Sequence, residues 1–350
     1  MTALYWLLAI FVFGLLIFLH ELGHYIAARA FGVKIEEFAI GVGPKILTYT
    51  SKKTEIKYSI GMFPLGGYVS MMGEDEETDS PHALCKKAPW KRLIITAAGA
   101  TVNLLTGLVV MLALVLASGP LASNIVSSYP PDSFFEENNI ISSETYGLQA
   151  GDRILAVNGQ RVHIGFDLSY EIMRTGGKEC TVTVLRDGVE RTLTVTFPRG
   201  SSQGLTIGLV DFYVEPEERT LGNILTQTWY RTTGTVKMVF ESFAGLLSGE
   251  YGLENVSGPI GVAGTMSEAA RTDILQFLLL VAVISINLGI VNLFPIPALD
   301  GGRIVFILIE MIFRRPVPPK YEGIVHFVGI IILFALMILI LFKDIFTLFA

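Results

Sequence analysis

Long apolar runs dominate the hydrophobic pattern of this chain. A helix needs about 20 mostly apolar residues to cross the hydrocarbon core of a bilayer. Runs of that length occur at 4–28, 93–118, 274–299 and 324–342. The first has no basic region before it and no small-residue cleavage site after it, so we expect a membrane span and not a removable signal peptide. The pattern predicts a polytopic α-helical membrane protein with four transmembrane helices.

The composition agrees with a membrane protein. The 350 residues are 51% hydrophobic and 17% charged, and the mean hydropathy of +0.55 is too high for an ordinary soluble enzyme. A net charge of −6 provides no basic surface for nucleic acid, so we expect no nucleic-acid partner. Cys85 and Cys180 are too few for a four-cysteine zinc site, and we expect no structural disulfide between them.

Basic residues predict the orientation of the spans. Lysines and arginines are concentrated between the first two runs and again between the last two. By the positive-inside rule both connections are cytoplasmic. The long stretch 119–273 and both termini are then extracytoplasmic.

The end of the first apolar run carries a chemical motif, His20-Glu21-Leu22-Gly23-His24. On a helix the two histidines stand four residues apart on one face, where they can hold one zinc ion while the glutamate activates a water. Ionisable residues inside a span are costly and usually functional. The alternatives are a chance occurrence of a short motif, or a pair of interfacial histidines.

A third ligand is expected at the same depth as the histidines. The third apolar run ends with Asn292, Pro295 and Pro297, and the prolines break the helix just before Asp300. A carboxylate there would complete a His-His-carboxylate site with one position open for water. The alternative for Asp300 is a simple helix-ending Asp-Gly turn.

Other candidate ligands are weaker. We expect His326 to be an interfacial histidine and Glu310 to be snorkelling or ion-paired. His82 and His163 belong to segments expected outside the membrane.

The motif at His20–His24, together with Asn292-x-x-Pro295-x-Pro297-x-Leu299-Asp300-Gly301, resembles the site-2 protease family of intramembrane zinc metalloproteases, most closely its bacterial RseP-type branch. The resemblance covers nearly the whole chain. It implies one Zn²⁺ per chain, held by His20, His24 and Asp300, with Glu21 as catalytic base. It also implies that Asn292, beside Pro295 and Pro297, helps to bind the substrate backbone.

The same resemblance implies a substrate class and a location. Substrates would be single-span membrane proteins already cut by another protease, such as anti-sigma factors or signal-peptide remnants. The enzyme would lie in the bacterial cell membrane, with its active site towards the cytoplasm. Two other classes stay open: a membrane protease that takes its third ligand from a later glutamate, and a non-enzymatic scaffold.

Short glycine-punctuated strands are predicted at 38–44, 54–60 and 64–69. Taken alone they indicate a small β-sheet near the membrane. The resemblance implies that Gly41 and Gly43 belong to a re-entrant β-hairpin beside the active site, whose free edge can pair with an unwound substrate. A purely structural hairpin is the alternative.

A soluble module is predicted at 122–205. It contains a strand bounded by turn residues within 147–159 and a hairpin formed by 181–188 and 191–196 across an Asp-Gly turn. The segment 147–159 resembles the PDZ signature of bacterial proteases, and this resemblance implies one inserted α+β PDZ domain. The preceding segment 141–146 lacks the usual Ser-Pro-Ala run, so peptide binding and a steric gate both stay open.

Within 206–273, residues 221–247 have the apolar spacing of an amphipathic helix, either lying on the outer membrane face or packed on the module. The expected organisation is therefore 1–30 first span, 31–92 β region, 93–118 second span, 122–205 PDZ domain, 206–273 helix and linker, 274–302 third span, 303–323 cytoplasmic loop and 324–343 fourth span.

Overall fold

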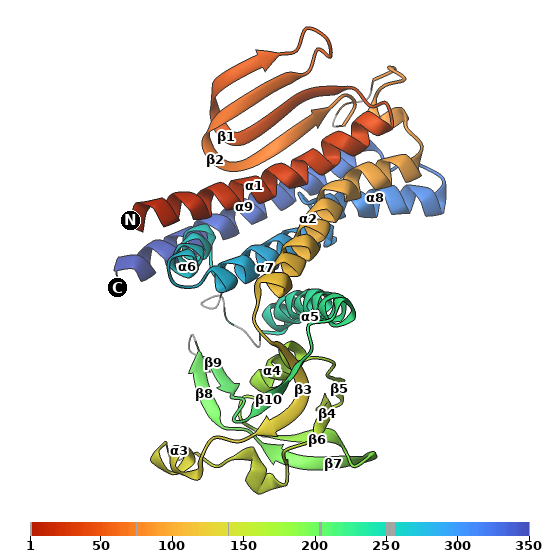
Figure 1. The fold of residues 1–350 in the computed structure, drawn as a ribbon. Coiled ribbons are helices and arrows are strands. Elements are labelled where there is room, and N and C mark those ends of the chain that lie inside the picture. Colours follow the sequence, from red (N-terminus) through yellow and green to blue (C-terminus); the bar gives the residue numbers. More distant parts are fainter. Residues whose placement is uncertain are drawn as a thin grey trace. The chain divides into compact units, whose positions relative to one another are not determined.

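The computed structural model describes residues 2–74, 76, 78–138, 140–202, 205–249, 252 and 256–349 (Figure 1). The chain divides into two compact units. The first comprises Met1–Val110 and Val239–Ala350, and the second is Met111–Met238. We describe each unit by itself.

Four helices in the described part of the chain are long and apolar enough to cross a membrane. They are α1 (Thr2–Ala30), α2 (Pro89–Ala117), α7 (Ile274–Leu293) and α9 (Pro319–Phe349). The predicted polytopic membrane protein is confirmed at this level.

The third span ends earlier than its apolar run suggested. Helix α7 stops at Leu293, because Pro295 and Pro297 lack the N–H groups that a continuing helix would need. A new helix, α8 (Asp300–Phe313), then begins at the predicted ligand. The expected loop 303–323 is therefore helical as far as Phe313, where Arg314 adopts a left-handed conformation with φ of 55°.

A bent two-stranded sheet lies along α1 in the first unit (Figure 1). It consists of β1 (Ile35–Thr50) and β2 (Lys57–Met71). Residues 37–40 of β1 have partners on both sides, 57–60 on one and 67–70 on the other. The bends need left-handed backbone at glycines, with φ of 80° at Gly41 and 90° at Gly43.

Two apolar clusters hold the first unit together. One joins the sheet to the end of α1 and the start of α2, and includes Ala28, Ile35, Phe38, Val69 and Ile95. The other joins α1 and α7 to the short helix α6 (Pro259–Thr272), through residues such as Leu16, Met266 and Val281.

Residues 343 and 344 attach the end of α9 to the start of α6. The Asp344 carboxylate accepts hydrogen bonds from the backbone N–H groups of Gly258 at 3.2 Å and Gly261 at 2.9 Å. These donors would otherwise lack helical partners at the N-terminus of α6. Lys343 adds a bond to the Val256 carbonyl at 2.7 Å.

The second unit is built around one sheet with the strand order β10-β3-β4-β6-β7, and β5 pairs with β4. A separate hairpin, β8–β9, completes its strands. The strands are β3 (Leu121–Ser128), β4 (Arg153–Val157), β5 (Gln160–Arg161), β6 (Glu179–Arg186), β7 (Val189–Thr196), β8 (Arg199–Ser202), β9 (Leu205–Gly208) and β10 (Tyr213–Glu217). The helical elements wholly within this unit are α3 (Asp132–Glu137), η2 (Ser143–Tyr146) and α4 (Gly165–Arg174).

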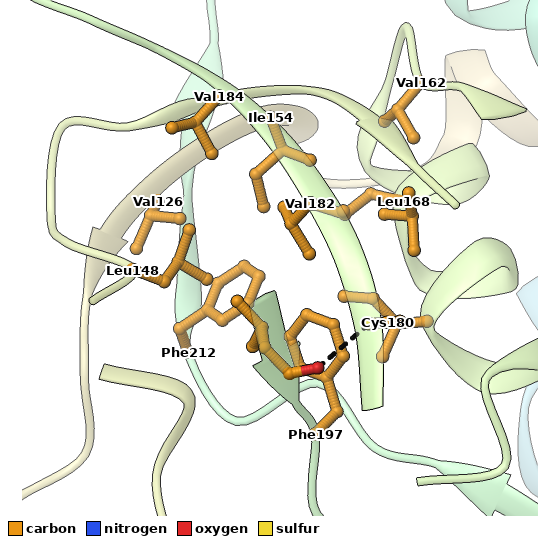
Figure 2. Close-up of a cluster of buried hydrophobic side chains, with 13 residues drawn as sticks. Val126, Leu148, Ile154, Val162, Leu168, Cys180, Val182, Val184, Phe197 and Phe212 are labelled. Carbon is orange, nitrogen blue, oxygen red and sulfur yellow. Dashed lines mark hydrogen bonds between the residues drawn. The ribbon is translucent and has the colours of Figure 1, made fainter. Parts of the chain in front are cut away.

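The predicted hairpin is confirmed. Strands β6 and β7 pair directly across Asp187 and Gly188, which both have positive φ, as a two-residue hairpin turn of the primed type requires. Their inward side chains meet Leu168 and Ile172 of α4 in the core shown in Figure 2. There the Cys180 thiol donates a hydrogen bond to the Val195 carbonyl at 3.2 Å, and burial raises the pKa of this thiol to about 11.

Helix α5 (Leu221–Ser248) occupies the predicted amphipathic stretch. Its part within the second unit packs on α4 through an ion pair of 2.6 Å between Lys237 and Glu171. Tyr230 also stacks on His163, with ring centroids 4.1 Å apart. Leu221, Leu225 and Trp229 remain exposed. One face of this part of α5 therefore packs against the second unit's module, and apolar side chains on another face remain exposed.

Candidate metal centre

The motif of the first span lies near the C-terminal end of α1, where both histidines are buried. Their Nε2 atoms are 3.2 Å apart, as expected for side chains one helical turn apart. Asp300, the first residue of α8, places Oδ2 3.2 Å from Nε2 of His20 and 3.2 Å from Nε2 of His24. The structure therefore brings together the three predicted ligand residues.

The geometry of the three atoms fits a tetrahedral metal ion. Zinc bonds of about 2.0–2.1 Å at tetrahedral angles separate neighbouring ligand atoms by about 3.3–3.4 Å. The three measured separations of 3.2 Å are nearly equal and close to that value. Oδ2 of Asp300 is also buried without a well-formed hydrogen bond in the described part of the chain. A bound cation would satisfy this carboxylate oxygen.

The outer ring nitrogens of the histidines contact α2. Nδ1 of His24 lies 2.9 Å from the Ile95 carbonyl, so it carries the proton and leaves Nε2 free to bind a metal. Nδ1 of His20 lies 3.3 Å from the Asn103 amide, whose Oδ1 is buried without a partner. Rotating the side-chain amide of Asn103 by 180° exchanges its oxygen and nitrogen, so that Oδ1 accepts a hydrogen bond from the Nδ1–H of His20. We assign that orientation.

Glycines allow α1 and α2 to approach closely at the centre. A Cβ atom at Gly99 would lie 2.8 Å from Nε2 of His20 and would overlap Nε2 of His24. On the other helix, a Cβ at Gly23 would lie 2.6 Å from the Ala98 carbonyl oxygen. Gly99 thus forms one wall of the candidate site, and any larger residue there would enter the space between the two histidines.

The segment between α7 and α8 is folded tightly against both helices. A Cβ at Gly301 would lie 2.5 Å from the Leu293 carbonyl oxygen, and one at Gly302 would lie 2.7 Å from that of Ile296. The two glycines after Asp300 therefore let α8 begin directly against the end of α7. Asn292 lies in the last turn of α7, and Pro295 and Pro297 lie within the connecting segment.

The model of peptidase family M50 matches residues 8–336. The chain belongs to peptidase family M50. A relative from Clostridium perfringens, CPE1693, is 34% identical over 343 residues, which are 98% of each chain. The zinc metalloprotease RasP of Geobacillus kaustophilus is 31% identical over 419 residues, or 96% of each chain. The regulator of sigma-W protease RasP of Bacillus subtilis is 29% identical over 97% of this chain and 98% of its own.

This membership confirms the predicted site-2 protease family, the zinc cofactor and the peptidase activity. The M50 peptidase is an integral membrane protein, and the residues that the structure describes contain four candidate spans.

In the M50 peptidase, Gly67 of β2 lies close to the side chain of Glu21. A Cβ at Gly67 would lie 3.2 Å from Cγ of Glu21 and 2.9 Å from the Ala39 carbonyl oxygen. Gly41 and Gly43, which the resemblance singled out, lie in β1 and have left-handed backbone.

The weaker candidates have other partners. Glu310 forms a 2.5 Å ion pair with Arg92, as predicted for an ion-paired residue. His326 accepts a hydrogen bond from the backbone N–H of Ala298 at 3.0 Å. His82 lies 3.2 Å from the Gly32 carbonyl, and His163 belongs to the second unit. Within the described residues, His20, His24 and Asp300 make up the one cluster suited to a metal.

Gly99 and Asn103 were missed by sequence reasoning. They stand four residues apart on α2, inside an apolar run. An asparagine in a membrane span is costly unless it is bonded, and this was the available signal.

Proposed function

We propose that this M50 peptidase hydrolyses a peptide bond in or near the transmembrane segment of single-span membrane proteins. The observation that carries the proposal is the position of the ligand cluster. His20 and His24 lie in the candidate span Ala3–Ala30, and Asp300 follows the candidate span Ile274–Leu293 after a short break. A site assembled from apolar helices favours a substrate that is itself in the membrane.

In the proposed mechanism His20, His24 and Asp300 hold the zinc ion. When bound, zinc supplies Lewis-acid activation of the scissile carbonyl and of the attacking water. Glu21, one residue after His20 and half-buried, accepts a proton from that water and delivers it to the leaving amine. The hydrogen bond from Nδ1 of His24 to the Ile95 carbonyl keeps that imidazole oriented through these steps.

Substrate binding by β-addition is supported by the position of β2. Residues 67–70 pair with 37–40 on one side and have no strand on their other side in the described part of the chain. Gly67 on this edge adjoins Glu21. An unwound substrate segment could pair there and present its backbone to the centre. The other proposed substrate-binding residues are Asn292, Pro295, Pro297, Gly41 and Gly43. The two glycines also shape the sheet.

A cavity of about 490 Å³ lined by several charged residues lies beside the first turns of α8. Its lining includes Glu74, Arg92, Arg303 and Glu310. Arg303 lies one helical turn after Asp300 and is ion-paired with Glu74. We propose that water reaches the centre from this side.

We propose that 122–205 forms a PDZ domain that gates or binds substrate. The antiparallel sheet with α4 beside it supports this assignment. At one end of β9, Gly208 lies so close to α4 that a Cβ would overlap the Ile172 carbonyl and lie 2.5 Å from Oγ1 of Thr175. No peptide fits between the two elements at that point, which favours the gate.

The proposed location is the bacterial cell membrane, with both termini outside and the centre towards the cytoplasm. The basic connections between the spans support this orientation. The relative in Bacillus subtilis is named a regulator of sigma-W protease. On the basis of that name, we propose that the substrates of this protein are membrane proteins already shortened by another protease, such as anti-sigma factors or signal-peptide remnants.

The decisive experiment uses the purified full-length protein, a transmembrane model substrate and measurement of bound zinc. Glu21→Gln should keep one zinc per chain and lose cleavage, because only the proton acceptor is removed. Wild-type cleavage by Glu21→Gln protein would refute the mechanism. A non-enzymatic scaffold would bind no zinc and would be indifferent to this change.

A further inference from the structure

His326 lies on α9, inside the candidate span Lys320–Asp344, where an ionisable side chain is costly and usually functional. It is not part of the ligand cluster. Its Nδ1 lies 3.0 Å from the backbone nitrogen of Ala298 and accepts a hydrogen bond from that N–H. Ala298 stands two residues before Asp300, in the segment that connects α7 with α8.

The connecting segment 294–299 has little internal support at Ala298. Two of its residues are prolines, which have no N–H to donate. The other amides bond locally: Phe294 to Val291, Ile296 to Phe294 and Leu299 to Ile296. Ala298 alone in this segment donates to a different helix. Its φ of 77° is in the left-handed region, which is unfavourable for alanine and needs an interaction to hold it.

The backbone of α9 meets the same segment one turn further on. A Cβ at Gly329 would lie 2.5 Å from Cβ of Pro297 and 2.7 Å from its carbonyl oxygen. Only 6% of the residues in the most apolar window of α9 are buried. Most residues of α9 are therefore not buried by the rest of the protein, whereas His326 and Gly329 contact the connecting segment directly.

We propose that His326 is a positioning residue for the zinc ligand Asp300. Its Nδ1 fixes the Ala298 peptide in the left-handed turn from which α8 starts. That turn sets the direction of the first residue of α8, and so the 3.2 Å distances from Oδ2 of Asp300 to both histidines. The inference deepens the proposed function and rests on Asp300 being a ligand.

Substitutions at 326 can separate the hydrogen bond from side-chain size. In asparagine Oδ1 stands where histidine has Nδ1, so His326→Asn keeps the acceptor. In glutamine the acceptor stands about where Nε2 would be, so His326→Gln misplaces it. His326→Leu removes it. Phe327→Leu, at a neighbouring side chain that is 63% exposed, is the matched control.

The test measures zinc affinity of each purified full-length variant by competition with a chelator. We expect His326→Leu and His326→Gln to bind zinc about 10–100-fold more weakly, as is usual when a group supporting a ligand is lost. His326→Asn and Phe327→Leu should keep the wild-type affinity. After substitution with cobalt, the visible spectrum should change in the Leu variant and be unchanged in the Asn variant.

Wild-type zinc affinity and cobalt spectrum in folded His326→Leu would overturn the inference. Equal losses in the Asn and Gln variants would also overturn it, and this pair decides the question if the Leu variant fails to fold. None of these measurements requires cleavage. Failure of every membrane substrate to be cut would therefore count against the proposed function alone, whereas zinc retained by Asp300→Ala would remove the premise of both.

Discussion

Gly99 on α2 lies so close to His24 on α1 that a methyl group at position 99 would overlap Nε2 of the histidine. The two helices can approach this closely because Gly23 stands on the facing side of α1. The site therefore depends on an absent side chain as much as on the ligands.

Gly99→Ala should abolish zinc binding, because the new methyl group would fill the space between the two histidines. Gly107→Ala on the same helix is the control. Its Cβ would crowd Ile286 and Ala282 of α7, so it should lower thermal stability while one zinc per chain remains bound. Metal analysis of folded protein checks both results, and normal zinc content in Gly99→Ala would show the geometry to be wrong.

Asn103→Leu should weaken zinc binding by about 10–100-fold, because it removes the acceptor that orients His20. Asn103→Asp keeps an oxygen at the same place and should bind zinc at least as tightly as wild type. Chelator competition measures both variants. If the Asp and Leu variants behave alike, Asn103 does not act through an oxygen facing His20.

Asp300→Ala should lose the metal, whereas Glu310→Ala should keep it. The second change leaves the guanidinium of Arg92 without its 2.5 Å partner in a largely buried position and should destabilise the fold by about 3 kcal/mol. Zinc content and thermal denaturation separate the two effects. Loss of zinc from folded Glu310→Ala would instead support a protease whose third ligand is a glutamate.

Gly67→Val should reduce cleavage strongly while zinc binding is unchanged. The valine side chain would press on Glu21 and on the Ala39 carbonyl, at the edge proposed to receive the substrate. Gly119→Ala is the control, because a Cβ there would meet no atom within 4 Å. Cleavage of a model substrate at saturating zinc tests this, and full activity in Gly67→Val would exclude the edge as the binding site.

The Cys180 thiol should resist alkylation in the folded protein. Burial raises its pKa to about 11, so at pH 8 about one thiol in a thousand is the reactive thiolate, and the thiolate fraction reaches one half only near pH 11. A Cys85→Ser variant isolates this thiol. Its reaction with iodoacetamide should be slow at pH 8 and should accelerate by about 100-fold or more in denaturant, where the pKa of the thiol returns to about 8.5. Fast labelling of the folded variant would contradict the packing shown in Figure 2.

The elements that sequence could predict are those with strong local signals. Apolar length defined the four spans, helical spacing placed His20 and His24 together, and Asp187-Gly188 specified its hairpin. Asp300 could be predicted as the third ligand because Pro295 and Pro297 break the helix just before it.

What sequence could not provide depends on contacts between distant segments. No sequence pattern indicates that Gly99 lines the candidate site, because a glycine in an apolar helix usually indicates only close packing. The interaction of Gly67 with Glu21 depends on how two bent strands lie on α1. His326 resembles an interfacial histidine until its partner, the Ala298 amide, is known. The helix α8 was read as a loop because a single amphipathic stretch after a proline pair carries a weak signal.

The predicted ligands come from distant parts of the chain, two from α1 and one from α8, and Gly99 of α2 lies beside the two histidines. The first two emerge early in synthesis, and Asp300 follows only after the second unit and α7 have been made. A ribosome-bound intermediate ending before α8 therefore has no third ligand. If these three residues hold the metal, the order of translation leaves the nascent chain without a complete metal site until Asp300 has been made.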